Sequence, residues 1–233
     1  MINILDWDSK YFGFIIANLD YSETESIDKK MIDDFAKSKS IRMIQCLCDI
    51  SDINQINNLE QCGFHFVDMK VDFKKYIKIA NNNSCNIIEA SVNDINELKN
   101  LASGLYANSR YYHEQIPEDK SRLFYQIWIE NAVKKTFDDI CFVAKQDDDI
   151  EGFITLKYSS PNVARIGLIG VDNKQASKGF GSKLISYSEN FLFNKSFNEL
   201  YVSTQGNNIL AQNFYIKNGF RIDSIKNWYY KFY

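Results

Sequence analysis

Residues 166–182 read Ile-Gly-Leu-Ile-Gly-Val-Asp-Asn-Lys-Gln-Ala-Ser-Lys-Gly-Phe-Gly-Ser. The apolar residues up to Val171 predict a buried strand over residues 163–171. Apolar positions 184, 185, 191 and 192 predict a helix over residues 180–193. Gly179 and Gly181 lie at the junction, where the absence of a side chain lets the backbone turn into the helix. The stretch therefore predicts a strand, a glycine-containing loop and a helix in direct succession.

The first turn of this predicted helix is suited to an anion. Its N–H groups have no partner within the helix, and the helix dipole favours negative charge beside them. Two lysines and a serine add charge or a hydroxyl group: Lys174, Lys178 and Ser182. The nucleotide-binding patterns GxxxxGK(S/T) and GxGxxG are both absent. Taken alone, the loop fits a plain tight turn as well as it fits a pyrophosphate cradle.

Residues 207–220 form a second informative stretch, Asn-Asn-Ile-Leu-Ala-Gln-Asn-Phe-Tyr-Ile-Lys-Asn-Gly-Phe. At roughly 100° per residue, Asn208, Ala211 and Tyr215 share one face of a helix. The small Ala211 lets a ligand approach the backbone, Asn208 offers an amide, and Tyr215 presents a phenol two turns later. By residue type alone, Tyr215 is either a packed core tyrosine or a proton donor with a pKa of about 10.

Together, residues 164–222 resemble the Gcn5-related N-acetyltransferase (GNAT) superfamily. Its members carry (Q/R)xxGxG(A/G) after a strand, and NxxAxxxYxxxGF one helix and one strand later. The second pattern is complete here, from Asn208 to Phe220. The first departs from the family twice, because Lys174 replaces Gln or Arg and Ser177 replaces the first Gly.

The resemblance implies a fold and a chemistry. The fold would be α/β (α+β) of the GNAT type, with a central mixed, mostly antiparallel sheet flanked by helices. The co-substrate would be acetyl-CoA or another acyl-CoA, and Tyr215 would be the catalytic residue that protonates the leaving thiolate. The strand ending at Val171 would be splayed from its neighbour, with the amides of Ile169 and Val171 facing the thioester arm. The implied coenzyme-binding residues are Ile169, Val171, Lys174, Gln175, Ser177, Lys178, Gly179, Phe180, Gly181, Ser182, Asn208, Ala211 and Phe214.

Three further segments resemble nucleotide-sugar N-acyltransferases of this superfamily, especially those that acetylate dTDP-linked amino sugars. They are residues 5–14 (LDWDSKYFGF), 108–117 (NSRYYHEQIP) and 123–131 (LFYQIWIEN). Tyr111 stands where Phe is usual, and His113-Glu-Gln replaces the commoner D-P-x-F. The resemblance implies a nucleotide-linked amino-deoxysugar as acceptor, in lipopolysaccharide or O-antigen biosynthesis, and a cytoplasmic homodimer.

These segments supply the candidate acceptor-binding residues Arg110, Tyr112, Tyr125 and Trp128. Arg110 is a fork-shaped donor suited to a phosphate or a carboxylate; its alternative role is a local pair with Glu114 or Glu118. The aromatic residues suit stacking on a base or a sugar ring, but positions 124, 125 and 128 also fit a helix stripe packed on the core. His113 is either a general base or a solvent-facing loop residue.

The rest of the chain predicts two units. Residues 1–80 read as a smaller α/β unit, with helices starting at Asp28 and Ile53 and strands over residues 41–50 and 64–74. The polar residues 81–84 read as a linker to an acyltransferase domain over residues 85–233. That domain is expected to contain helices over 92–106, 117–133 and 208–218, a hairpin turning at 147–149, and strands over 199–204 and beyond Phe220. Trp7 and Phe12 are expected to clamp the two units together.

Composition narrows the classes of partner. The chain has 233 residues, 45% of them hydrophobic, and a net charge of −3, which favours neither nucleic acid nor an anionic membrane as partner. No apolar run approaches the roughly 20 residues of a membrane span. Two His and five Cys without a CxxC pattern predict no metal site and free thiols in a reducing compartment.

Two other functions stay open at the level of sequence. One keeps the GNAT fold but acylates a protein, a peptide or a small amine. The other is a non-catalytic acyl-CoA-binding module. The presence of both Asn208 and Tyr215 argues against this second function. The transferred group is acetyl by default, although a wider pocket would admit a longer acyl chain.

Overall fold

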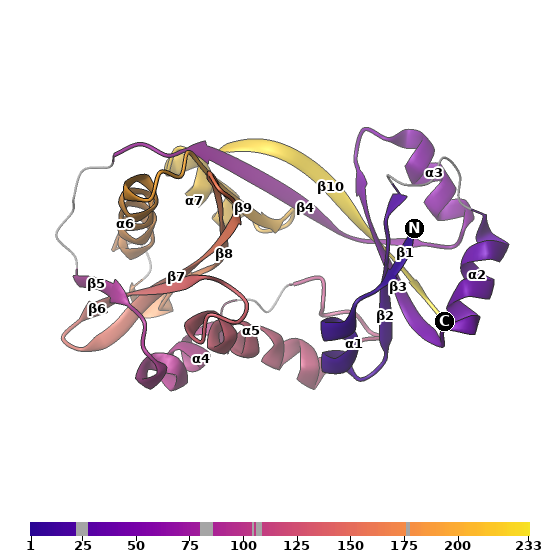
Figure 1. The fold of residues 1–233 in the computed structure, drawn as a ribbon, viewed down its shortest axis with the longest axis horizontal. Coiled ribbons are helices and arrows are strands. Elements are labelled where there is room, and N and C mark those ends of the chain that lie inside the picture. Colours follow the sequence, from indigo (N-terminus) through magenta and orange to yellow (C-terminus); the bar gives the residue numbers. More distant parts are fainter. Residues whose placement is uncertain (22–27, 80–85, 104, 106–108, 176–177) are drawn as a thin grey trace.

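The computed structural model describes residues 1–21, 28–79, 86–103, 105, 109–175 and 178–233. Within these residues, no helix is long and apolar enough to cross a bilayer. The elements in chain order (Figure 1) are β1 (Ile2–Ile4), α1 (Asp6–Phe12), β2 (Ile15–Leu19), α2 (Lys29–Ser38), β3 (Ile41–Asp49), α3 (Ile53–Gln61), β4 (His65–Tyr76), β5 (Asn86–Glu89), η2 (Val92–Asp94), α4 (Ile95–Ser103), α5 (Glu118–Val133), β6 (Ile140–Gln146), β7 (Asp149–Ser160), β8 (Val163–Val171), η3 (Asn173–Gln175), α6 (Phe180–Asn194), β9 (Glu199–Gln205), α7 (Ile209–Lys217) and β10 (Arg221–Phe232).

The strands form one sheet in the order β1-β2-β3-β10-β4-β9-β8-β7-β6-β5. Within the described residues, β2 pairs with β3 and β8 with β9 in parallel, and the other neighbours are antiparallel. The mixed, mostly antiparallel sheet flanked by helices is confirmed. The predicted linker falls within residues 80–85, outside the described part of the chain, so the division into two units stays a prediction.

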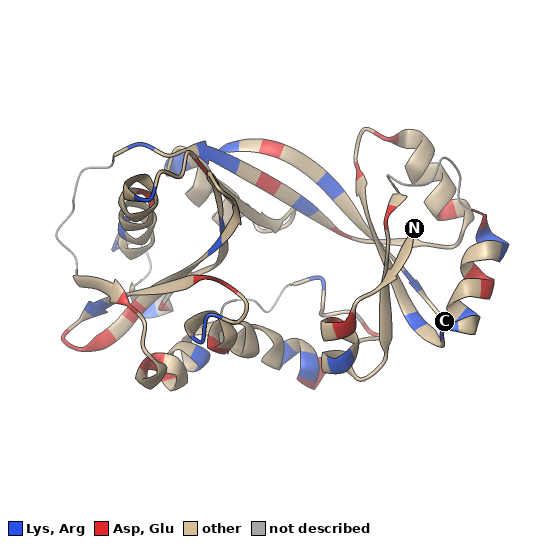
Figure 2. Cartoon of the chain, viewed as in Figure 1, with Lys and Arg blue, Asp and Glu red and all other residues tan. Residues whose placement is uncertain are grey.

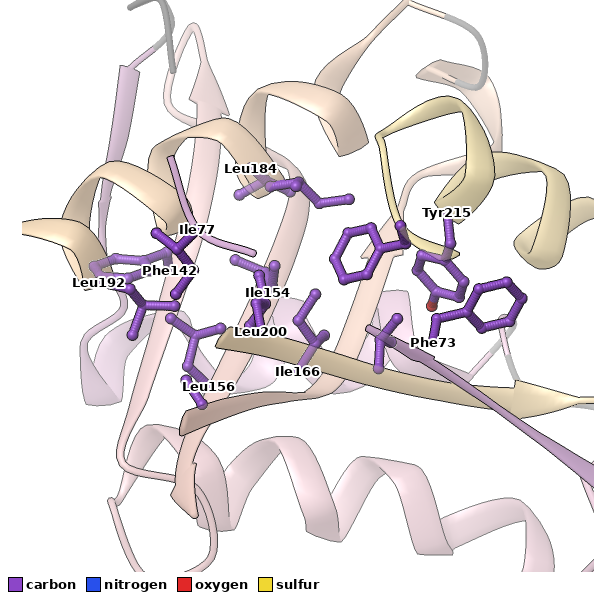
Figure 3. Packing of buried hydrophobic residues seen from close by; sticks show 14 of the residues in the cluster. Phe73, Ile77, Phe142, Ile154, Leu156, Ile166, Leu184, Leu192, Leu200 and Tyr215 are labelled. Carbon is purple, nitrogen blue, oxygen red and sulfur yellow. The ribbon is translucent and has the colours of Figure 1, made fainter. Parts of the chain in front are cut away.

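Three apolar cores hold the helices on the sheet. The α6–α7 core contains Phe180, Leu184 and Tyr215 above β7, β8 and β9, and Figure 3 shows part of it. The α4–α5 core contains Leu98 and Ile129, and the α2–α3 core, at the other half of the sheet, contains residues of both those helices. Along β10, Tyr229 belongs to the α2–α3 core and the next residue, Tyr230, to the α4–α5 core. Because successive strand residues point to opposite faces, these two cores lie on opposite sides of the sheet.

Aromatic contacts fasten α1 onto α5. The Trp7 ring lies 5.8 Å from that of Phe124 and 5.6 Å from that of Phe137. The Phe12 ring lies 5.5 Å from that of Tyr111 and 6.0 Å from that of Phe124. Trp7 and Phe12 therefore join the first helix to a helix more than 100 positions later in the chain; that they clamp two units together stays a prediction.

The parallel pair β8–β9 opens part-way along its length. The register runs from Val163 opposite Glu199 to Ile166 opposite Val202, and pairing ends there. Beyond that point β8 stays paired with β7 as far as Val171, and β9 stays paired with β4 as far as Gln205. The two strands therefore diverge, as the resemblance implied for the strand that ends at Val171.

Core packing on β4 gives a direct test of this architecture. Phe73 is 0% exposed and Phe66, on the same strand, is 54% exposed. We expect Phe73→Ala to lower the free energy of unfolding by about 3–5 kcal/mol, because it leaves a cavity in the α6–α7 core. Phe66→Ala is the matched control and should lower it by about 1 kcal/mol or less. Urea denaturation followed by circular dichroism measures both; equal losses would contradict the core assignment.

Candidate active site

A cavity of about 960 Å³ opens where β8 and β9 separate, and we call it the cleft. Its lining has two ends, one at α6 and α7 and the other at α5. The α6–α7 end contains residues that the two sequence patterns singled out: Gly179, Phe180, Gly181, Ser182, Asn208, Ala211, Phe214 and Tyr215. The α5 end contains aromatic and charged residues: Asp68, Lys70, Arg110, Tyr125, Trp128, Asp138, Lys157, Arg165 and Trp228. The cavity between the diverging strands thus has two ends with different chemistry.

The α6 N-terminus presents bare backbone to the cleft. Gly179 is the N-cap with φ 85°, a left-handed conformation, and no side chain caps the helix. The first helical bond runs from the Lys183 amide to the Gly179 carbonyl, 3.0 Å, so the amides of Phe180, Gly181 and Ser182 precede it. Apart from its chain neighbours, no atom of the described residues lies within 4 Å of where a Gly179 Cβ would stand. This end of the cleft therefore fits an anion.

Helix α7 packs closely against that turn. A Cβ on Gly181 would stand 2.9 Å from the Phe214 ring, so the missing side chain sets the distance between α6 and α7. Asn208 caps α7, because its Oδ1 accepts a hydrogen bond of 3.1 Å from the Ala211 amide. Since Oδ1 is occupied, the Asn208 amide nitrogen is the group left for a ligand.

Tyr215 is a core residue and a cleft residue at once. It is 5% exposed, its ring lies 5.6 Å from that of Phe73, and it lines the cleft. Figure 3 shows the ring among the core side chains. Among the described residues its hydroxyl has no hydrogen-bond partner, and burial raises the pKa of Tyr215 above its ordinary value. The phenol therefore stays protonated at neutral pH, and its hydroxyl group is free to donate to a ligand.

Arg110 lies in an aromatic cage at the α5 end. Its guanidinium carbon is 3.9 Å from the Trp228 ring centre and 4.3 Å from that of Tyr111. Nη1 donates to Gln45 Oε1 at 2.9 Å and to the Tyr230 hydroxyl, and Nη2 donates to the Tyr111 hydroxyl at 2.7 Å.

The local carboxylate pair considered for Arg110 is not formed. Glu118 pairs instead with Arg122, at 2.6 Å, and no salt bridge within 4.0 Å joins Arg110 to any described carboxylate. Its hydrogen-bond partners are neutral groups, and its charge acts on the carboxyl groups of Asp8 and Asp68, whose burial-raised pKa values it opposes.

The structure separates the aromatic candidates. Tyr125 and Trp128 line the cleft, and the Trp128 indole donates to Asp138 Oδ2 at 3.0 Å. Phe124 is 3% exposed in the α4–α5 core, as the helix-stripe interpretation required. Tyr112 is 39% exposed and is not part of the cleft lining; its neighbour Tyr111 occupies that place. The acceptor-binding role of Tyr112 stays a prediction.

The remaining candidates divide in the same manner. Ile169, Val171 and Gln175 line the cleft, whereas Lys174 and Lys178 do not; Ser177 lies outside the described residues. His113 stacks on Phe232, with ring centres 4.9 Å apart, and is absent from the cleft lining. Sequence reasoning missed the charged residues Asp68, Lys70, Asp138, Lys157 and Arg165. Period-2 alternation marked β4 as half-buried, but nothing in the sequence showed which strands would lie beside it.

Residues 103–220 match the acetyltransferase (GNAT) family. The chain belongs to this family. It is 29% identical, over 99% of its length and 97% of the relative's, to dTDP-fucosamine acetyltransferase from Escherichia coli O6:H1. It is also 30% identical over 40% of its length to streptothricin acetyltransferase from Escherichia coli, covering 54% of that protein. The protein is therefore a GNAT acetyltransferase, an acyl-CoA-dependent transferase.

Solved structures show the same fold. A GCN5-related N-acetyltransferase from Sphaerobacter thermophilus has a TM-score of 0.67 at 11% identity, covering 99% of this chain and 76% of that one. The PaiA N-acetyltransferase from Thermoplasma acidophilum, solved in complex with coenzyme A, has a TM-score of 0.51 at 22% identity, covering 65% of this chain and 100% of that one. Among the described residues, no group of three or more His, Cys, Asp or Glu is placed to hold a metal ion.

Gly179 allows a matched test of the α6 turn. We expect Gly179→Val to weaken coenzyme A binding, because a β-branched side chain disfavours φ 85° and projects into the open space beside the amides. Gly13→Val is the control, since Gly13 has φ 83° and, chain neighbours aside, no described atom within 4 Å of a Cβ, but it is not part of the cleft lining. Both variants should lose a similar thermal stability; calorimetry should show weaker coenzyme binding in Gly179→Val alone. Equal coenzyme affinity in the two would make the loop merely structural.

Proposed function

We propose that the protein moves an acyl group, by default acetyl, from acyl-CoA to the amine of a nucleotide-linked amino-deoxysugar. The observation that supports this proposal most is the position of Arg110. Its guanidinium lies among aromatic rings in the wall of the cleft and forms no salt bridge with a described carboxylate. An anionic acceptor meets that charge, whereas a polyamine would be repelled by it. The relative that matches nearly the whole chain, dTDP-fucosamine acetyltransferase, supports the same class of acceptor.

The coenzyme would occupy the α6–α7 end. The amides of residues 180–182 would bind its pyrophosphate, with Gln175 beside them. The pantetheine arm would pass between the diverging β8 and β9, against the backbone of Ile169 and Val171 and within reach of Asn208. The support for this placement is the end of β8–β9 pairing at Ile166, directly before those residues. Lys174, Lys178 and Ser177, which the resemblance also implied, stay predicted coenzyme-binding residues.

The reaction would be a direct transfer. The acceptor amine, after losing a proton to water, attacks the thioester carbonyl; a C–N bond forms and the C–S bond breaks. Backbone N–H groups of β8 would stabilise the tetrahedral oxyanion. Tyr215 would donate its proton to the departing thiolate, and burial, which raises its pKa, ensures that the phenol holds that proton beforehand. The cytoplasmic location, the homodimer and the place in O-antigen biosynthesis stay predictions.

An acceptor panel tests the function. Release of free thiol from acetyl-CoA is measured with dTDP- and UDP-linked amino sugars, with spermidine, and with a lysine peptide. Turnover on an amino sugar nucleotide is expected. Turnover confined to spermidine or the peptide would reassign the acceptor, and coenzyme binding without turnover on any amine would indicate a non-catalytic module.

Tyr215→Phe tests the proton donor. The variant keeps the ring that packs on Phe73 and loses only the hydroxyl, so fold and coenzyme affinity should stay unchanged. Since general acid catalysis contributes typically about 10²–10⁴ in rate, kcat should fall by that factor. A variant with near-normal kcat would remove Tyr215 from the mechanism and leave it a core residue.

Arg110→Ala tests the acceptor site. Loss of a charge-assisted hydrogen bond costs about 1.5–3 kcal/mol, so the KM for the sugar nucleotide should rise roughly ten- to a hundredfold. The KM for acyl-CoA should change little. Arg122→Ala is the control, because Arg122 is an exposed arginine paired with Glu118. If both KM values rise together with a lower melting temperature in Arg110→Ala, the residue orders the fold and does not select the acceptor.

A further inference from the structure

Cations face cations across the strands that form one wall of the cleft. Lys226 of β10 stands directly opposite Lys70 of β4, and Lys157 of β7 stands directly opposite Arg165 of β8. Figure 2 shows the charged bands along β4 and β10 where these strands join the two halves of the molecule. Like charges directly opposite each other destabilise a sheet. Two such pairs near one cavity therefore call for an opposite charge that binds there.

One carboxylate, Asp72, is shared by two of these cations, while Asp68 and Asp138 also line the cleft. Asp72 is 5% exposed, and its oxygens accept hydrogen bonds from Lys70 at 2.8 Å, Arg165 at 3.3 Å, Ser224 at 3.3 Å and the Ser203 hydroxyl. One carboxylate is thus shared by two cations and fully occupied. Lys226 also lies opposite Asp49 of β3, and Lys157 lies 5.0 Å above the Phe137 ring.

The direction of two pKa values agrees with an excess of positive charge. Although burial alone would raise it, the pKa of Asp72 is lowered by hydrogen bonds from Lys70 and Ser203 and by the charges of Lys70 and Arg165. Burial lowers the pKa of Lys70, the charges of Arg165 and Lys226 lower it further, and the Asp72 partner opposes this change only in part. Lys70 is therefore a largely buried cation whose carboxylate partner, Asp72, is shared with Arg165.

Free donors of both residues remain for a ligand. Lys70 uses one of its three N–H groups on Asp72. Arg165 uses Nη1 on Asp72 and Ser203, so Nε and Nη2 have no partner among the described residues. Its side chain is 37% exposed, and both residues line the cleft. Arg110 offers less, because both hydrogens of its Nη1 are already donated.

We propose that Lys70 and Arg165 bind the diphosphate of the acceptor, together with Arg110, while Asp72 and Ser203 position the two cations. This inference rests on the proposed function and adds the diphosphate subsite to it. All three cations line the same cavity. Arg110 stacks on Trp228, which stands two residues along β10 from Lys226, the residue that faces Lys70. The subsite is separate from the coenzyme's pyrophosphate, which belongs at the α6 turn.

The test measures binding of dTDP and of inorganic pyrophosphate by calorimetry, with coenzyme A saturating so that the α6 turn is filled. Lys70→Met and Arg165→Met should each weaken both probes about 10- to 100-fold, and Lys70→Arg should restore most of the affinity. The matched control is Lys74→Met: Lys74 lies on the same face of β4 and pairs with Glu199 at 2.7 Å, but it does not line the cleft. Coenzyme affinity and melting temperature, measured on each variant, report that the cleft is intact.

The outcomes separate the subsite from the proposed function. Unchanged affinity for both probes in Lys70→Met and Arg165→Met, or an equal loss in Lys74→Met, overturns the subsite even if the enzyme acetylates an amino sugar nucleotide. Lys70-dependent binding of pyrophosphate without binding of dTDP supports the subsite and contradicts a dTDP-linked acceptor. If the unaltered protein binds neither pyrophosphate nor dTDP, the subsite is also overturned.

Discussion

The structure depends on the separation of β8 from β9 after Ile166 and Val202. A parallel pair normally continues while both strands last, but here each strand leaves its partner and keeps its outer neighbour. In the gap that results, the backbones of β8 and β9 no longer pair with each other. This gap brings four features together in one cavity: the cleft itself, the turn at Gly179, Tyr215 and the charged residues of β4.

Strands β4 and β10 connect the N-terminal part of the sheet to the part that contains the cleft. Each spans from the α6–α7 core to the side of α2 and α3 (Figure 1), and β10 pairs with both β3 and β4. The N-terminal elements are consequently part of the same sheet as the acyltransferase elements. Arg110 shows the effect, because the groups around it come from the loop before α5, from Gln45 of β3 and from Trp228 and Tyr230 of β10.

Sequence predicted what is local and missed what depends on distant pairing. Residues 163–220 have strong periodicity and two patterns with fixed spacing, so β8, α6, β9 and α7 were predicted within one or two residues. The short elements β1, α1, β2 and β5 carry too few residues for a periodic signal and were not assigned. The side chains of Lys70 and Arg165 come together through β9, which lies between their strands. That neighbourhood is decided by sheet order, and no local pattern records it.

The place of β10 between β3 and β4 also governs how the chain reaches its folded state. Strands β3 and β4 follow each other closely in sequence, joined through α3, yet they do not pair with each other. During translation, the edges of β3 and β4 that pair with β10 therefore have no strand partner until residues 221–232 have been made. Contacts between residues so far apart in sequence slow folding and leave edges open to wrong pairing with other chains. Premature termination before β10 would thus yield a chain prone to aggregation, even though it would still carry both sequence patterns of residues 174–220.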